Sequence, residues 1–293
     1  MLLALVKTMR PKQWLKNGFL FVALFFDRQF TDPAALFQVI LGALLFSLLA
    51  GTIYIINDIN DLEADRAHPK KSSRPLPAGE ISIRAAIAAA SFLLVVIFPL
   101  SYLLSPLFAA FALLYFLLNL LYTFWLKHIP LIDVLVLASF YVIRVAAGVS
   151  IVAVERFSPW LYLFTIFLAL YLGIGKRRAE LVMLAGKASS HRRVLDGYSI
   201  SFLDQLITIV LTLAILTYSL YTFDAPNLPE NDSMMLTIPF VIYGIFRYLY
   251  LVHIKESGDA PEEILLTDRP LQISIFLWGV SVLVIFNLFP AAN

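Results

Sequence analysis

A dense group of acidic side chains near residue 60 is followed at once by a group of basic ones. Asp58, Asp61 and Asp65 are spaced i, i+3 and i+7, so they project from one face if the preceding helix continues through them. Three carboxylates on one face repel one another unless a cation neutralises them. Their hard oxygen atoms suit Mg²⁺, which completes its coordination shell with water and substrate phosphates. We therefore predict that these aspartates bind Mg²⁺ and that the basic residues just downstream bind the phosphates.

A solvated loop is the alternative interpretation of this stretch, because charge also gathers wherever a loop is wet. The stretch follows an apolar run from Val39 to Ile56 that is long enough to cross a bilayer. An acidic run, a Pro-Lys pair and an Arg-Pro pair occur together at this membrane boundary. The combination favours a phosphate site over a loop that is merely solvated.

The composition is that of an integral membrane protein. Hydrophobic residues make up 60% of the 293 and charged residues 14%, with a mean hydropathy of +0.84. Soluble domains are roughly 45–50% apolar and about 25% charged. The chain contains no cysteine, which excludes disulfides and thiolate metal sites. It shows no Gly-rich phosphate loop, no Ser-His-Asp arrangement and no nucleic-acid-binding patch, so no nucleic-acid partner is expected.

Apolar stretches bounded by charge, Pro, Gly or Asn predict one all-α domain, residues 1–293, with nine membrane-spanning helices. The expected spans are 14–28, 34–57, 83–104, 107–126, 130–153, 159–176, 199–222, 234–254 and 270–290. The first of them is short. Residues 1–12 carry Lys7, Arg10 and Lys12 among Leu and Val, which predicts a helix lying on the membrane surface before the first span.

The distribution of Lys and Arg predicts the orientation of the bundle. With the amino terminus in the cytoplasm, Arg28 and Arg156 are the only basic residues on the far side. Arg144 and Arg247 lie inside spans, and the remaining Lys and Arg residues fall on the cytoplasmic side. Long polar loops gathered on one face are where function is expected, so we predict a cytoplasmic active site. The long loops on that face are 58–82, 177–198 and 255–269.

A second charged group ends the sixth expected span. It contains Lys176, Arg177 and Glu180, with Tyr171 upstream. Lys176 and Glu180 are i, i+4 and can pair on one helix face. The adjacent cations also suit the helix dipole and the anionic leaflet, which would make the group a membrane anchor. The functional alternative is a second phosphate-binding group, in which Glu180 orients a Lys or Arg or binds metal.

Arg144 lies in the middle of an expected span, where a charge costs about 2.5–3.5 kcal/mol on insertion scales. It should therefore face the bundle interior and meet an anion. Asp133 is on the same helix but too far along it to pair directly, which implies a substrate phosphate or a carboxylate from another span. Lys127 and Asp133, at the cytoplasmic end of this span, are further and weaker candidates for the site, Lys127 as a group that binds a phosphate.

Both ends of the chain carry weaker candidates. Trp14 with its flanking cations is typical of an interfacial anchor, but Lys16 and Asn17 at the same boundary could face a headgroup site. The last cytoplasmic loop predicts a short surface helix around Ile264–Leu266. Asp268 is then either the start signal of the final span or part of the site.

The pattern Asn57-Asp58-x-x-Asp61-x-x-x-Asp65, at the end of the second expected span, resembles the first aspartate-rich motif of the UbiA superfamily of intramembrane prenyltransferases. In that family two such motifs, at the ends of helices two and six, hold a diphosphate through Mg²⁺. The resemblance covers the whole chain in topology and implies a UbiA-type bundle of nine helices. The second motif departs from the family pattern, because Lys176-x-x-x-Glu180 replaces Asp-x-x-x-Asp, and this argues against ordinary prenyl-diphosphate chemistry.

That departure, with the segments 10–17, 68–75 and 246–248, is similar to the branch that includes decaprenyl-phosphate phosphoribosyltransferases. The resemblance implies transfer of 5-phosphoribose from phosphoribosyl diphosphate to a polyprenyl phosphate lipid, with Mg²⁺ and release of diphosphate, at a bacterial plasma membrane in cell-wall biosynthesis. Two alternatives stay open. One is a UbiA-type transfer of a prenyl group from prenyl diphosphate to an aromatic acceptor, and the other is a transporter in which Arg144 marks a permeation path. A homo-oligomer is also left open.

This chemistry assigns a role to each candidate residue. The expected metal ligands, also catalytic, are Asp58, Asp61 and Asp65. The residues expected to support the metal or to neutralise the donor's phosphates are Asn57, Arg66, Lys70 and Arg74. Lys176 and Arg177 are expected to complete the phosphate clamp, with Glu180 orienting them, and all three are also expected to be catalytic. Tyr171 is expected to contact the substrate. The candidates for the acceptor's phosphate are Lys16, Asn17, Lys127 and Arg144.

Overall fold

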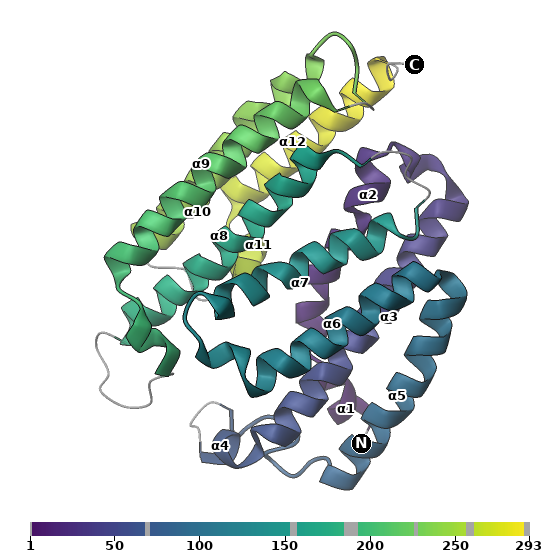
Figure 1. Ribbon diagram of the computed structural model, residues 1–293, viewed down its shortest axis with the longest axis vertical. Helices are drawn as coiled ribbons and strands as arrows, with labels where there is room; N and C mark the ends of the chain where they lie inside the picture. Colours follow the sequence, from purple (N-terminus) through teal and green to yellow (C-terminus); the bar gives the residue numbers. More distant parts are fainter. Residues whose placement is uncertain are drawn as a thin grey trace. The chain divides into compact units, whose positions relative to one another are not determined.

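The computed structural model describes residues 2–67, 71–152, 157–184, 193–225, 228–255 and 261–289, and every regular element in them is a helix (Figure 1). The expected all-α fold is therefore confirmed for these residues. Contacts divide the chain into two compact units. The first unit is Met1–Phe124 with Ile143–Val154, and the second unit is Trp125–Val142 with Glu155–Asn293.

The helices are numbered in chain order, with η marking a 3₁₀ helix. Those of the first unit are α1 (Leu2–Thr8), η1 (Pro11–Leu20), α2 (Phe21–Phe26), η2 (Gln29–Thr31), α3 (Pro33–Asn60), α4 (Leu62–Ala67), α5 (Ile83–Leu104), α6 (Pro106–Phe124) and the end of α7 (Ile132–Val149). Those of the second unit are η3 (Leu126–His128), the start of α7, α8 (Pro159–Leu184), η4 (Arg193–Gly197), α9 (Ile200–Asp224), η5 (Ser233–Thr237), α10 (Ile238–His253), α11 (Pro261–Thr267) and α12 (Arg269–Leu288).

Eight helices in the described part of the chain are long and apolar enough to cross a membrane, and they match every expected span except the first. Residues 14–28 instead fall mainly on η1 and the short helix α2. A 3₁₀ helix rises about 2.0 Å per residue and an α-helix about 1.5 Å. Together η1 and α2 therefore extend roughly 29 Å, close to the ~30 Å thickness of the hydrocarbon core. The expected count of nine spans is therefore not confirmed, and residues 14–28 do not form the single α-helix that was expected.

In the first unit, α3 packs against α5, α6, η1 and α1 (Figure 1). Asp32 caps its start by accepting a hydrogen bond from the backbone N of Ala34 at 2.9 Å. Near the middle, the ring of Phe46 contacts those of Phe108 and Tyr115 on α6, with centroids 5.5 and 5.2 Å apart. These contacts fix the helix whose last turn carries Asp58.

Close approach of two segments in the first unit requires a glycine. A Cβ added to Gly148 on α7 would lie 2.1 Å from the backbone oxygen of Leu20, at the end of η1. No side chain fits at that distance, so the bare backbone of α7 lies against η1. Arg144 is one turn earlier on α7 and is therefore carried to the same segment.

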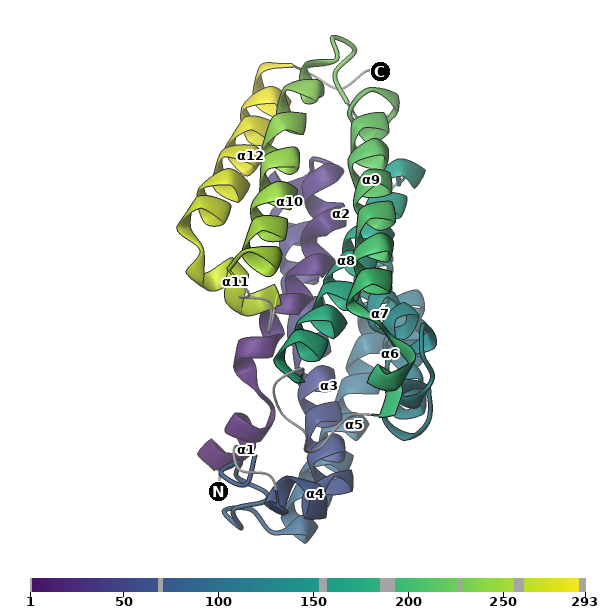
Figure 2. The same ribbon diagram turned by 90° about the vertical axis from the view of Figure 1, so that its left-hand side faces the viewer.

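In the second unit, α8 packs along α9 and α10 along α12 (Figure 2). The expected end of the sixth span at residue 176 is wrong, because α8 continues to Leu184 and the basic residues 176–178 lie inside it. The expected short helix before the last span is α11. Asp268 is the start signal of α12, since its side chain accepts a hydrogen bond from the backbone N of Leu271 at 2.9 Å.

Candidate active site

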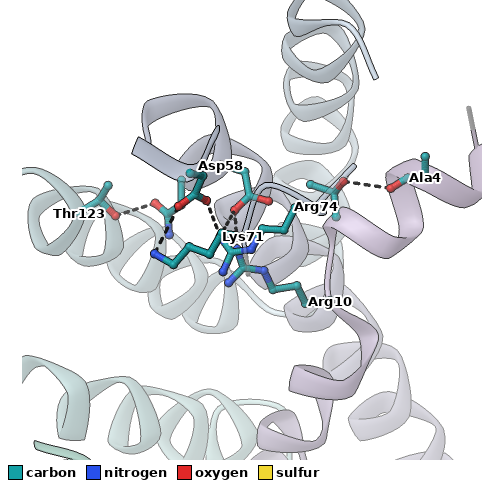
Figure 3. A network of polar contacts seen from close by, with 9 residues as sticks. Ala4, Arg10, Asp58, Lys71, Arg74 and Thr123 are labelled. Carbon is teal, nitrogen blue, oxygen red and sulfur yellow. Dashed lines mark hydrogen bonds and ion pairs between the residues drawn. The ribbon is translucent and has the colours of Figure 1, made fainter. Parts of the chain in front are cut away.

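Asp58 is buried at the end of α3 and receives two arginines. Its side chain is 2% exposed, and its Oδ1 accepts from the guanidinium of Arg10 and from that of Arg74, the latter at 3.3 Å (Figure 3). Within the described residues, its Oδ2 is buried and has no hydrogen-bond partner. One oxygen of this buried carboxylate is neutralised and the other is unpaired. The unpaired oxygen can therefore accept a hydrogen bond or bind a metal ion.

Asp65 lies on the same side of the α3–α4 segment as Asp58. Its Oδ2 accepts from Arg74 at 2.5 Å and its Oδ1 lies 3.3 Å from Nζ of Lys71. Arg74 therefore bridges the two aspartates, which shows that they share a face. The helix does not run unbroken between them, because α3 ends at Asn60 and α4 begins at Leu62. The backbone N of Asp65 still bonds the oxygen of Asp61 at 2.8 Å, so the helical direction is kept.

A buried turn holds Arg74 in place. The backbone N of Ala78 donates to the oxygen of Arg74 at 2.9 Å, and Pro75, Leu76 and Pro77 are buried directly after it. Leu76 belongs to an apolar cluster of the first unit that also contains Ile55 and Leu62. The apolar packing of this turn positions the guanidinium that the aspartates share.

The other residues expected near the metal contact partners other than Asp58 and Asp65. Asn57 accepts a hydrogen bond from the hydroxyl of Thr123 on α6 at 2.7 Å, which ties the end of α3 to α6. Asp61 is half-buried and its Oδ1 accepts from the amide of Asn60 at 2.8 Å. Arg66 is exposed and pairs with Glu63 at 2.9 Å. Lys70 lies outside the described residues.

The carboxylate oxygens of this cluster decide how well it fits a divalent cation. The described part of the chain contains no group of three or more His, Cys, Asp or Glu side chains that could hold a metal ion. Mg²⁺ usually takes only one or two protein carboxylates and draws its other ligands from water and substrate phosphates. The orphaned Oδ2 of Asp58 is a ligand of that kind. The cluster therefore fits a metal that arrives with phosphates, and not a preformed cage of three aspartates.

The second unit holds a buried ion pair that involves Arg177. Its side chain is 1% exposed, and its Nε donates to Asp133 on α7 at 2.6 Å while Nη1 donates to Glu180 at 2.7 Å. Tyr198 donates to the other oxygen of Asp133 at 2.6 Å and accepts from the backbone N of Leu131 at 2.6 Å. Burial, and then the hydrogen bond to Asp133, raise the pKa of Tyr198 above its ordinary value. The guanidinium of Arg177 is thus directed at protein carboxylates.

The remaining candidates of the second unit lie near this pair in sequence. Tyr171 on α8 is buried with its ring edge-on to that of Tyr248 on α10, the centroids being 5.0 Å apart. Lys176 and Lys127 are half-buried. Arg178, next to Arg177, donates to Asp204 on α9 at 2.6 Å.

Arg144 is buried in the first unit within a polar group. Its Nε donates to the amide oxygen of Asn17 at 2.8 Å and a terminal nitrogen donates to the hydroxyl of Tyr115 at 2.7 Å. The amide nitrogen of Asn17 in turn donates to Ser47 on α3 at 2.9 Å. The group joins η1, α3, α6 and α7. Lys16, beside it in sequence, is half-buried.

The sequence did not predict the roles of Arg10, Tyr115 and Tyr198 in these contacts, and it indicated Asp133 only as a weaker candidate. Each contacts a partner at least 29 positions away along the chain, so no local spacing reveals it. Asp133 alone had a usable signal, since a carboxylate inside an apolar span requires a cation.

Comparison with known proteins shows the family and the fold of the chain. Residues 18–284 match the model of the UbiA prenyltransferase family. The chain is 34% identical over 291 residues to a decaprenyl-phosphate phosphoribosyltransferase of Mycolicibacterium smegmatis, over 94% of this chain and 89% of that protein. It is 31% identical to the protein of the same name from Corynebacterium glutamicum, over 98% and 87%. A UbiA homolog from Archaeoglobus fulgidus bound to DMAPP and Mg²⁺ shares the fold, with a TM-score of 0.72 and 20% identity over 97% of this chain and 99% of that one.

Proposed function

The chain belongs to the UbiA prenyltransferase family and is a membrane-embedded transferase, and we propose that it transfers 5-phosphoribose from phosphoribosyl diphosphate to a polyprenyl phosphate, releasing diphosphate. The names of relatives that align with nearly the whole chain support this reaction over other reactions of the family. The predicted membership of the family is confirmed, and the donor and acceptor are proposals.

The observation that carries the proposal is the cationic setting of the first aspartate motif. Asp58 and Asp65 are already contacted by Arg10, Lys71 and Arg74. A prenyl diphosphate presents one charged group to such a site, whereas phosphoribosyl diphosphate presents its diphosphate and a separate 5-phosphate. A donor with two anionic groups needs more cations, and guanidinium groups suit phosphate oxygens through paired hydrogen bonds.

The proposed reaction is a displacement at the anomeric carbon of the ribose. The bond from that carbon to the diphosphate oxygen breaks, its electrons leave with the diphosphate, and an oxygen of the acceptor phosphate forms the new bond. A phosphate monoester is largely ionised near neutral pH, because its second pKa is about 6, so no strong general base is needed. When bound, Mg²⁺ neutralises the charge that develops on the leaving diphosphate. The protein then contributes positioning and electrostatic stabilisation.

Individual residues divide this work as follows. We assign the metal to Asp58 through its orphaned Oδ2, with Asp61, Asp65 and Asn57 in support. Arg74 orients both aspartates and lies where it can also contact a phosphate oxygen. The residues that remain predictions for the donor's phosphates are Arg66, Lys70, Tyr171, Lys176, Arg177 and Glu180. The residues that remain predictions for the acceptor's phosphate are Lys16, Asn17, Lys127 and Arg144.

A donor and acceptor panel tests the proposal. Purified protein in detergent is given Mg²⁺ and either radiolabelled phosphoribosyl diphosphate or labelled prenyl diphosphate, each with polyprenyl phosphates of several lengths or an aromatic acceptor. We expect labelled lipid and free diphosphate only from phosphoribosyl diphosphate with a polyprenyl phosphate. Turnover only with prenyl diphosphate and the aromatic acceptor would instead assign the chain to the ordinary reaction of the family. Product formation in detergent, where no gradient exists, also excludes a pure transporter.

A further inference from the structure

Arg10 is held against α3 by two partners at once. Its guanidinium pairs with Oδ1 of Asp58 (Figure 3). Its Cζ also lies 4.6 Å from the centre of the Tyr54 ring. Tyr54 and Asp58 are i, i+4 on α3, so they form one continuous face. The cation–π contact does not depend on the carboxylate. The Arg10 side chain is 30% exposed, so its guanidinium is reachable from solvent while it rests on the ring.

The backbone that carries Arg10 is seated on the same face of α3. A Cβ added to Gly51 would lie 2.5 Å from the end of the Met9 side chain and 2.9 Å from its Cβ, so Met9 packs directly against the bare helix backbone. Gly51, Tyr54 and Asp58 are spaced i, i+3 and i+7, as a single helix face requires. Arg10 itself has a left-handed backbone, with φ of 53°. Such a conformation in a non-glycine residue persists only when its surroundings fix it.

The charges of this group favour an anion over a bare metal ion. Oδ1 of Asp58 is contacted by two guanidinium groups, Arg10 and Arg74. Asp65 shares Arg74 and is also contacted by Lys71. Three cations therefore contact two carboxylates. A divalent cation entering alone would be repelled by the arginines, whereas diphosphate would be attracted.

We propose that Arg10 binds the diphosphate of the donor and, when no diphosphate is present, serves as the counter-ion of Asp58, so that the metal binds more tightly with diphosphate than alone. The proposal rests on the proposed function, because it takes the donor to carry a diphosphate. It adds a binding residue from the segment before the first span. It also sets an order of events. When diphosphate binds, the guanidinium of Arg10 exchanges the Asp58 carboxylate for a phosphate oxygen, and it stays on the ring of Tyr54 throughout.

The test measures two affinities on the purified full chain. Isothermal titration with inorganic diphosphate in the presence of Mg²⁺ reports the anion site, and equilibrium binding of Mn²⁺ without diphosphate reports the bare metal site. In Arg10→Gln we expect diphosphate binding to weaken about tenfold to a hundredfold, because one charge-assisted contact is lost. We expect Mn²⁺ alone to bind several-fold more tightly than to the wild type, because one positive charge has left Asp58.

Matched variants separate this role from a structural one. Lys12→Gln removes an exposed cation two positions away and should change neither affinity. Tyr54→Phe keeps the ring and should retain diphosphate binding, whereas Tyr54→Leu should weaken it a few-fold. Arg10→Lys, which keeps the charge but loses the fork geometry, should fall between wild type and Arg10→Gln.

Two results would overturn the proposal. If Arg10→Gln leaves both affinities unchanged, Arg10 does not bind diphosphate. If both affinities fall together with the denaturation temperature, Arg10 is a structural brace. The outcome for the proposed function is separate: a wild-type protein that binds Mg²⁺ and diphosphate as expected but transfers no phosphoribose refutes the reaction and not the role of Arg10.

Discussion

At the scale of single residues, buried carboxylates in the two units are satisfied in different ways. Asp133 has both oxygens occupied, one by Arg177 and the other by Tyr198. Asp58 has one oxygen paired and one oxygen buried without a partner in the described residues. A buried carboxylate with both oxygens bonded is satisfied by the protein, while one with an unpaired buried oxygen costs free energy unless a ligand completes it. We therefore place binding at Asp58.

Replacing Asp58 by Asn tests that placement. The variant keeps the shape of the side chain but removes its charge, so it should bind a metal–diphosphate complex poorly. We expect phosphoribosyl transfer to fall at least about a hundredfold, as when a preorganised electrostatic contact is removed. The protein should still insert and purify, because Arg10 and Arg74 are partly exposed and keep solvent as a partner. Activity per mole of purified, monodisperse protein is the measurement.

Glu63→Gln is the matched control for Asp58→Asn. Glu63 lies in the same acidic run, but its side chain is 85% exposed and its ion pair with Arg66 is at the surface. Surface pairs contribute about 0–1 kcal/mol, so this variant should keep nearly full activity. Equal turnover by Asp58→Asn and wild type would contradict the metal assignment, whatever the control does.

The ion pair between Arg177 and Asp133 gives a prediction about stability. Arg177→Met leaves the charge of Asp133 buried without a counter-ion and should destabilise the fold by about 3–5 kcal/mol. Asp133→Leu leaves Arg177 its pair with Glu180 and should cost less. The double variant removes both charges and should recover most of that loss. Thermal denaturation in detergent reports all three. Single variants as stable as the wild type would show that the pair is not buried as described.

The sequence could predict the acidic face and one nearby cation, Arg74, but not the cations that reach the buried carboxylates from distant parts of the chain. Helical spacing alone places Asp58 and Asp65 together, and Arg74 was a candidate because it follows them closely. Arg10 reaches Asp58 across 48 positions, and Arg177 reaches Asp133 across 44. Contacts of that range depend on how helices pack, and packing is not encoded in local spacing. Sequence spacing therefore predicts which residues lie together when they share a helix. It does not predict the pairs that form between different helices.

At the scale of elements, hydrophobic runs predicted the long helices well because a span must be apolar along most of its length. Ser82 caps α5 through the backbone N of Ala85 at 3.2 Å, and the helix begins at the expected residue 83. The errors have physical causes. Helix α8 continues past its basic residues because Arg177 and Arg178 find carboxylate partners, so charge does not end the helix. The 3₁₀ form of η1 has no distinct hydrophobic period and could not be anticipated.

The start of α12 gives a prediction about pH. Asp268 caps this helix and also accepts two hydrogen bonds from Arg247, at 2.8 and 3.1 Å, which hold the pKa of Asp268 below its usual range. A carboxyl with a lowered pKa in the fold stabilises it above its unfolded pKa of about 3.9, and that contribution is lost as the pH falls towards the folded value.

Asp268→Asn isolates this contribution, because Asn can still cap the helix but cannot form the ion pair. The denaturation temperature of the wild type should exceed that of Asp268→Asn from pH 5 to 7. The difference should shrink steadily below about pH 4. Asp268→Ala, which also loses the cap, should be less stable than Asp268→Asn throughout the range. A difference between wild type and Asp268→Asn that does not depend on pH would contradict the assignment.

At the scale of the whole molecule, composition established an integral membrane protein and the family resemblance established the fold. The described residues contain eight long apolar helices with the fold of the UbiA family, and the first of the nine expected spans is not confirmed. The orientation rests on the distribution of Lys and Arg, and we propose that the end of α3 that carries Asp58 faces the cytoplasm.

The absence of cysteine makes the orientation directly measurable. Ser73→Cys places a thiol in the exposed loop after α4, and Asn231→Cys places one in the loop before η5. In intact cells, a membrane-impermeant maleimide should label Asn231→Cys and leave Ser73→Cys unlabelled. Inverted membrane vesicles should give the opposite pattern. Labelling of Ser73→Cys from outside the cell would reverse the proposed topology.

The most direct measurement is a structure of the purified protein with Mg²⁺ and phosphoribosyl diphosphate but no lipid acceptor, so that the donor is not consumed. We expect metal density at Oδ2 of Asp58, diphosphate bound to that metal, and the guanidinium groups of Arg10 and Arg74 on phosphate oxygens. Metal and diphosphate bound away from these residues, with Asp58 still paired only to the two arginines, would contradict this expectation.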